Sequence, residues 1–286
     1  MILRQALTDA YIHACEVELQ AFKPGNVSVF SDGHDMMVDD FRLSAEVSAA
    51  PITNPAYSLG EKIYYAVKAT REAVACNTNL GIILLCAPLI QAAQLADRPA
   101  DLRQALDDVL TTTTEQDADW VFRAILLASP GGLGESEQQD VHQQATVTLS
   151  QAMSIAADKD RIALQYTNCF KDIFDFAILT YNRAFVLSGD SGWAALKVYA
   201  EMLARYPDSH IERKYGKQYS EWIAEEMALL CKAMDVANKL EEVLTMLYRI
   251  DEAFKAKKIN PGTTADITVA TVLVVLLEQL FRQTDV

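Results

Sequence analysis

The chain has 286 residues, of which 51% are hydrophobic and 22% charged, so it can bury a large core and does not have the composition of a disordered protein. Its formal net charge of −14 repels nucleic acid and anionic membranes at long range, which excludes nucleic acid as a general partner. The first residues form no apolar signal-peptide stretch and the five cysteines form no CxxC pair, so we expect a cytoplasmic protein with free thiols.

Helical periodicity dominates the chain from its start. Apolar side chains recur at helical spacing from Leu3 to Phe22, and the pattern stops at the breaker Lys23-Pro24-Gly25-Asn26. A short helix that Asp39 and Asp40 could cap should follow and end before Pro51. The further helices that we expect cover residues 59–75, 80–96, 101–112, 117–128, 138–157, 160–187, 191–205, 219–234, 238–257 and the apolar segment around 267–281.

Two segments, Leu80–Ala96 and Ile267–Phe281, are unusually apolar. Both are shorter than the roughly 20 residues that cross a bilayer, so we interpret them as a buried central helix and a buried C-terminal helix rather than membrane spans. We find no run of alternating strands, no internal repeat and no flexible linker. The sequence therefore predicts an all-α protein with a single compact multi-helix domain over residues 1–286.

The residues whose side chains could bind a ligand or take part in catalysis lie in five polar breaks, at 23–36, 77–81, 131–137, 208–216 and 260–266. Four of them lead into, or lie beside, a helix start, where free backbone N–H groups and the helix dipole favour phosphate. Composition alone favours the alternative that these breaks are ordinary turns between helices.

The five breaks resemble the motifs of one enzyme family. KPGNVSVFSDGHDM (23–36) is similar to PKPGLV…GxHxDM, NTNLG (77–81) to NTHKG, and GGLGESE (131–137) to GxRGEAE. DSHIERKYG (208–216) resembles DTN-xxx-RGG, and NPGTTADITVAT (260–271) resembles SPGGSADLLA. In this order and across nearly the whole chain, they resemble the triphosphoribosyl-dephospho-CoA synthase family, in a divergent branch with the KPGNVS form of the first motif.

The resemblance implies a transferase that uses ATP as its ribosyl donor. The 2′-hydroxyl of 3′-dephospho-CoA attacks C1 of the ATP ribose, adenine leaves, and the triphosphate stays on the transferred sugar. Such a reaction needs a carboxylate beside an oxocarbenium-like carbon, a general base and an acid. The triphosphate needs cations and Mg²⁺, which prefers oxygen ligands.

The residues that match the family motifs supply these groups. We expect catalytic roles for His34, Asp35, Glu135 and Asp266. We expect substrate binding by Lys23, Gly25, Asn26, Asn77, Thr78, Gly134, Arg213, Lys214 and Gly262. Candidate ligands of Mg²⁺ are Asp35, Glu61, Glu135 and Asp208. As alternatives, Asp35 and Asp266 could be plain helix caps, and Arg213 and Lys214 a solvated charge run.

The chain departs from the family pattern at three places. Asn79 and Leu80 stand where the family has His and Lys, Leu133 stands where it has Arg, and Lys214 replaces a Gly. Each lost charge weakens phosphate binding by roughly 1.5–3 kcal/mol. Two alternatives therefore stay open: a ribosyl or phosphoribosyl transferase of pterin-type one-carbon cofactor biosynthesis, and a non-catalytic helical nucleotide-binding protein. We expect the five breaks to meet in one cleft. Assembly into a homodimer is an open alternative to a monomer.

Overall fold

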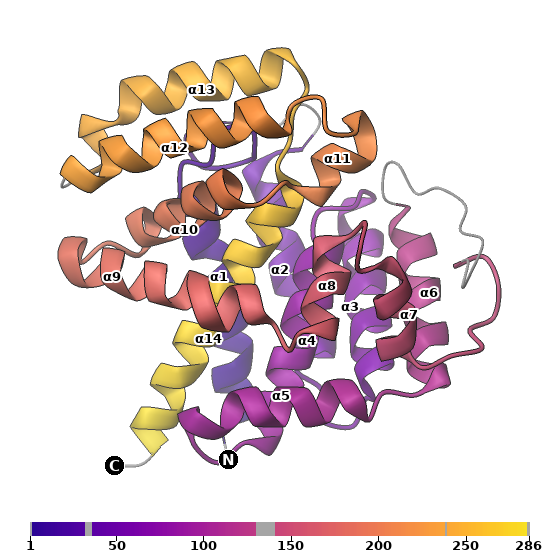
Figure 1. The fold of residues 1–286 in the computed structure, drawn as a ribbon. Coiled ribbons are helices and arrows are strands. Elements are labelled where there is room, and N and C mark those ends of the chain that lie inside the picture. The colour runs from indigo at the N-terminus through magenta and orange to yellow at the C-terminus, as the bar shows by residue number, and fades with distance from the viewer. Residues whose placement is uncertain (1, 32–35, 130–140, 238, 285–286) are drawn as a thin grey trace. The chain divides into compact units, whose positions relative to one another are not determined.

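The computed structural model describes residues 2–31, 36–129, 141–237 and 239–284, and all regular elements in these ranges are helical (Figure 1). The described part of the chain contains no strand, and one isolated β-bridge joins Ser28 and Ser31. The all-α prediction is thus confirmed. The α-helices are α1 (Arg4–Gln20), α2 (Val38–Ile52), α3 (Leu59–Val74), α4 (Leu80–Leu95), α5 (Leu102–Thr111), α6 (Glu115–Ala128), α7 (Leu149–Ala156), α8 (Arg161–Thr167), α9 (Ile178–Ser188), α10 (Ser191–Arg205), α11 (Ser209–Tyr215), α12 (Ser220–Val236), α13 (Leu244–Ala256) and α14 (Gly262–Thr284).

Contacts divide the chain into two compact units. Unit 1 comprises residues 1–14, 39–171 and 273–286, and unit 2 comprises residues 15–38 and 172–272. Unit 1 therefore holds α2 to α8, and unit 2 holds α9 to α13, while α1 and α14 each contribute to both. That the whole chain is a single domain stays a prediction.

In unit 1 the central helix is α4, which is apolar on every side and therefore buried. Helices α3 and α6 pack closely because Gly60 lies against Asp117: a Cβ atom on Gly60 would lie 2.6 Å from the Asp117 Cα. The Asp117 carboxylate accepts hydrogen bonds from the Ser58 hydroxyl at 2.7 Å and the Gly60 N–H at 2.9 Å. Burial would raise the pKa of Asp117, but these hydrogen bonds and those from the N–H and hydroxyl of Thr114 outweigh it and hold the pKa below its usual value.

In unit 2, α10 packs against α9 and α12, and α12 runs beside α13 (Figure 1). Helix α10 is buried over most of its length from Trp193 to Leu203. Helix α14 starts in this unit and continues into unit 1. The segment 21–31, which follows α1, packs against α10 and α13 through the contacts described below.

Several predicted elements differ from the structure. Helix α2 continues through Pro51 to Ile52, because a proline in the last turn removes only one intrahelical bond. Asp39 and Asp40 lie inside its first turn, where their negative charges interact favourably with the helix dipole. The helix expected over 138–157 begins, within the described residues, only at Leu149. The break at 208–216 contains a short helix, α11, because Asp208 caps it.

The helix expected over 160–187 is also interrupted. Helix α8 ends at Thr167, Cys169 and Phe170 adopt φ of +52° and +53°, and the helix resumes through a π-turn (η2, Ile173–Ala177) into α9. Neither residue is a glycine or proline, so the sequence has no helix-breaking residue that would predict this interruption.

Helix α14 is longer than the apolar segment that predicts it. Among the described residues it is the one helix long and apolar enough to cross a membrane, over Gly262–Gln283, and 72% of its apolar window is buried inside the protein. Burial of this extent is what a core helix shows, which agrees with the predicted buried C-terminal helix.

Candidate functional site

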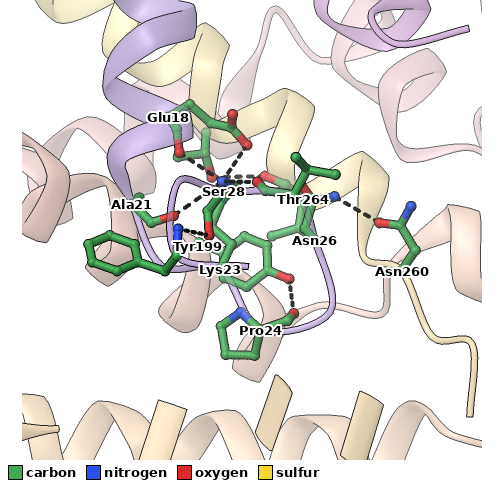
Figure 2. Close-up of polar contacts among 12 residues, drawn as sticks. Glu18, Ala21, Lys23, Pro24, Asn26, Ser28, Tyr199, Asn260 and Thr264 are labelled. Carbon is green, nitrogen blue, oxygen red and sulfur yellow. Dashed lines mark hydrogen bonds and ion pairs between the residues drawn. The ribbon is translucent and has the colours of Figure 1, made fainter. Parts of the chain in front are cut away.

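Three of the five motif segments meet in unit 2. Gly25 has φ of +81°, and a Cβ atom there would lie 2.9 Å from the carbonyl oxygen of Ile259. The Asn26 amide donates to Asn260 Oδ1 at 2.7 Å (Figure 2). Gly262 lies against His210, whose Nδ1 would be 3.4 Å from an added Cβ. The described residues 23–31, 208–216 and 260–266 of these segments are therefore neighbours, although they lie far apart in the sequence.

Lys23 lies inside the loop that follows α1, which we call the N-terminal loop (residues 23–31). Its side chain is fully buried, and Nζ donates to the carbonyl oxygens of Glu18 at 2.7 Å, Val27 at 2.8 Å and Ala21 at 3.3 Å. It also forms an ion pair with Glu18 Oε1 at 3.1 Å (Figure 2). Burial raises the pKa of Glu18 and lowers the pKa of Lys23, and the ion pair opposes both shifts. The ammonium group thus holds the loop around itself.

Two residues that the sequence analysis did not single out hold the same loop from outside. Asp251 on α13 accepts a hydrogen bond from the Gly25 N–H at 2.7 Å and one from the Ser31 hydroxyl at 2.6 Å. The Tyr199 hydroxyl on α10 donates to the Pro24 carbonyl oxygen at 2.7 Å (Figure 2). Burial raises the pKa of Tyr199 well above its usual value, so the phenol stays a donor.

Asp208, a predicted Mg²⁺ ligand, caps two helices. Its Oδ1 accepts from the N–H groups of His210 at 2.9 Å and Ile211 at 3.1 Å, at the start of α11. Its Oδ2 accepts from the N–H and the hydroxyl of Thr264, both at 2.8 Å, at the start of α14. Burial raises the pKa of Asp208, and the hydrogen bonds from Thr264 oppose that shift. Both carboxylate oxygens are therefore engaged within the protein.

The remaining predicted residues of unit 2 are more accessible. Arg213 and Lys214 are exposed in the last turn of α11, and Lys214 Nζ lies 5.1 Å from the centroid of the Tyr215 ring. Asp266 is half-buried, one turn into α14, and Gly262 opens that helix. Exposed cations and a half-buried carboxylate are the residue types that a phosphate-rich ligand can reach.

Unit 1 contains the second motif segment, where the side chains mainly organise the start of α4. Asn77 Oδ1 accepts from the Leu80 N–H at 3.2 Å, and the Thr78 hydroxyl bonds to the Ser44 hydroxyl at 2.5 Å. Asn79, which stands where the family has His, is buried and donates to the Ser48 hydroxyl at 3.3 Å. Leu80 is buried as well.

Glu61 lies in unit 1 at the start of α3. Its Oε2 accepts from the Ser58 N–H at 2.9 Å, and the Ser58 hydroxyl accepts from the Glu61 N–H, which makes a capping box. The predicted residues His34, Asp35, Gly134 and Glu135 lie outside the described residues. Within the described ranges, no group of three or more His, Cys, Asp or Glu residues is placed to hold a metal ion.

A cavity of about 320 Å³ in unit 1 lies beside α6, lined in part by Asp119, Arg123 and His142. The Arg123 guanidinium stacks 4.2 Å from the ring centroid of Trp120 and 4.6 Å from that of Tyr64. Stacking of this kind fixes the guanidinium and leaves its edge for an anion. The sequence analysis did not single out Arg123, because it lies on an ordinary amphipathic helix.

Comparisons with known proteins agree with this description. The family model of the ATP:dephospho-CoA triphosphoribosyl transferases matches residues 4–285. A solved structure from Archaeoglobus fulgidus, provisionally assigned as a triphosphoribosyl-dephospho-CoA synthase, is 26% identical with a TM-score of 0.63, covering 82% of this chain and 97% of the archaeal chain. No curated protein sequence matches significantly.

The fold and these matches first define a class: the chain is an all-α transferase enzyme. It belongs to the ATP:dephospho-CoA triphosphoribosyl transferase family, whose reaction moves the triphosphoribosyl group of ATP to dephospho-CoA. The predicted resemblance to this family is confirmed.

Proposed function

We propose that this chain releases adenine from ATP by transferring the triphosphoribosyl group to a hydroxyl of 3′-dephospho-CoA or a related cofactor precursor. The bond between C1 of the ribose and the adenine nitrogen breaks, and a bond from C1 to the acceptor oxygen forms. The acceptor hydroxyl gives up its proton, and the departing adenine takes one up. The family match over residues 4–285 carries this proposal.

The chemical step requires a base, an acid and a carboxylate near C1. We assign these tasks to His34, Asp35, Glu135 and Asp266. Asp266 supports the assignment because it is half-buried on α14 and close in sequence to Gly262, which lies against His210. Partial burial keeps a carboxylate reachable by substrate while limiting competition from water.

For the substrates we propose two kinds of contact. Arg213 and Lys214 in unit 2 are exposed cations suited to phosphate. Gly134 and Gly262 let backbone approach a ligand, and Asn77 and Thr78 offer polar groups. For Gly25, Asn26 and the buried Lys23 we propose a contribution through the shape of the N-terminal loop.

We propose that Mg²⁺ arrives bound to the triphosphate, since Mg²⁺ commonly uses substrate phosphates and only one or two carboxylates. The described carboxylates do not by themselves form a site: Asp208 is saturated by four donors, and Glu61 belongs to a capping box. We therefore favour Asp35 and Glu135 as its protein ligands.

Thermal shift tests nucleotide binding directly. A ligand that binds only the folded state stabilises it by about 2.7 kcal/mol at a hundredfold excess over its dissociation constant. We expect the midpoint to rise with ATP and Mg²⁺ and to rise less when EDTA is added. An equal rise in EDTA contradicts the role of Mg²⁺, and no rise in any condition contradicts ATP as the donor.

As a second proposal for the acceptor, we consider a cofactor precursor that carries less phosphate than 3′-dephospho-CoA, because Leu80 and Leu133 are neutral where the family has Lys and Arg. A flat, less charged precursor of a pterin-type one-carbon cofactor fits this change. A rival explanation is that both leucines serve the core, and Leu80 is indeed buried. We propose that the enzyme acts in the cytoplasm on small molecules, without membrane or nucleic-acid partners.

Adenine release separates the acceptors. Purified protein is incubated with ATP, Mg²⁺ and each acceptor, and free adenine is quantified by chromatography. Turnover of 3′-dephospho-CoA with kcat/KM of about 10⁴ M⁻¹s⁻¹ or more refutes the altered acceptor. Restoration of that turnover by Leu80→Lys combined with Leu133→Arg supports it. If the protein binds ATP but releases no adenine with any of the acceptors, the result favours a non-catalytic nucleotide-binding protein.

A further inference from the structure

Asp251 is a buried carboxylate in the apolar stripe of a helix. It is 3% exposed and stands beside Ile250, one turn from Leu247 and Phe254, all of which are buried. A carboxylate at such a position loses its hydration and is stable only if it is paired and hydrogen-bonded. Its contacts therefore explain why an acidic residue can occupy a core position.

Those contacts lie at both ends of the N-terminal loop. Oδ1 accepts from the Gly25 N–H at 2.7 Å, and Oδ2 accepts from the Ser31 hydroxyl at 2.6 Å. Lys255, one turn along α13, neutralises the carboxylate with Nζ 3.0 Å from Oδ2 and also donates to the Ser31 hydroxyl. One side chain thus fixes residues 25 and 31 to the same helix.

The loop has little freedom at the point where Asp251 holds it. Gly25 has φ of +81°, and a Cβ atom there would lie 2.9 Å from both the Ile259 carbonyl oxygen and Phe254 Cδ2. The backbone therefore lies directly on α13 and on the segment that follows it. The next residue, Asn26, bonds to Asn260 at 2.7 Å, so the position of Gly25 determines whether that contact can form.

We propose that Asp251 is a positioning residue that holds the N-terminal loop against α13 so that Gly25 and Asn26 are in place for the substrate. This proposal rests on the function proposed above. Asp251 acts through the loop and is not itself a catalytic residue. Small displacements of positioning groups are costly, since a shift of about 1 Å can lower the rate by about 10²-fold.

The test compares Asp251→Ala and Asp251→Asn with Glu252→Ala, which removes an exposed carboxylate from the same helix. Hydrogen exchange of peptides covering residues 23–31 reports on the loop, and peptides of α10 report on the core. We expect faster exchange in the loop for Asp251→Ala, little change in α10, and no change in either for Glu252→Ala. Asp251→Asn keeps an acceptor for the Gly25 N–H and should fall in between, and it serves if the alanine variant does not fold.

Activity completes the test. At temperatures well below each variant's unfolding midpoint, we expect kcat for adenine release to fall about 10²-fold in Asp251→Ala, less in Asp251→Asn, and not in Glu252→Ala. Unchanged loop exchange, or a looser loop with unchanged kcat, overturns the proposal. If the unmodified protein releases no adenine with any acceptor, the proposed function has failed independently, and the dissociation constant for ATP, measured by calorimetry, becomes the readout. An ATP affinity equal in all variants then overturns the positioning role.

Discussion

Replacing Lys23 by Met should lower the free energy of unfolding, because it removes the ion-pair partner of the buried Glu18 carboxylate. Both side chains lie within the protein, Lys23 at 0% and Glu18 at 4% exposure, and their ion pair is 3.1 Å long. Breaking a buried pair by removing one partner costs about 3–5 kcal/mol, because the other charge is left uncompensated. We expect Lys23→Met to lower the free energy of unfolding by that amount, and Lys23→Met with Glu18→Gln to cost clearly less than the sum of the single changes.

The pH dependence of the same variant follows from the sign of the shift. Without Lys23, burial raises the pKa of Glu18 further above its unfolded value of 4.5, so the folded state binds a proton that the unfolded state has released. The stability of Lys23→Met relative to the unmodified protein should therefore recover as pH falls from 7 toward 5, and decline as pH rises through the raised pKa.

Urea denaturation followed by circular dichroism measures both effects, at pH 5 and pH 7. Lys68→Met is the control, since Lys68 pairs with Glu72 on the exposed face of α3, and its midpoint should not move. A loss below about 1 kcal/mol for Lys23→Met, the range of surface pairs, or strict additivity with Glu18→Gln, would refute the reasoning.

Three other changes test further parts of the structure. The pKa of Lys62 is lowered from 10.5 to about 8 by burial, so the charged amine costs at most about 3 kcal/mol below pH 8, and this cost shrinks as pH rises toward 10.5. Denaturation at pH 7 and pH 10 should therefore show that the stability of Lys62→Met relative to the unmodified protein is higher at the lower pH. Asp208→Ala removes the shared cap of α11 and α14 and should cost about 3 kcal/mol, whereas a loss under 1 kcal/mol would show that Thr264 finds another acceptor. Gly25→Ala should cost about 3 kcal/mol through backbone strain and overlap. Gly189→Ala has a similar φ of +69° but nothing within 4 Å, so it should cost only about 1 kcal/mol, and equal losses for the two glycines would contradict the close packing of Gly25.

Long periodic segments made the fold predictable. Helices α1, α3, α4 and α10 begin and end close to the predicted positions because apolar side chains at helical spacing, or in α4 a continuous apolar run, lie between strong breakers or caps. The break between α8 and α9 could not be predicted, since Cys169 and Phe170 reach positive φ under tertiary packing that local propensity does not record. The polar sequence of α11 did not predict a helix, because that helix depends on capping by the side chain of Asp208.

The site was predictable in part. The motif segments that meet in unit 2 were recognised from their order, but their internal partners were not. Asp251 does have a signal in the sequence, because it is an acidic residue in register with the apolar residues Leu247, Ile250 and Phe254. The burial of Lys23 gave none, because a lysine in a loop is normally exposed and only the fold brings three carbonyl oxygens around it.

The bond between Gly25 and Asp251 spans 226 residues of sequence, which has a consequence for synthesis on the ribosome. At roughly 5–20 residues per second, Asp251 is added about 10 to 45 s after Gly25. The N-terminal loop is thus translated among the first residues and completed among the last. A chain that stops before α13 contains every residue of the loop and lacks the carboxylate that holds it.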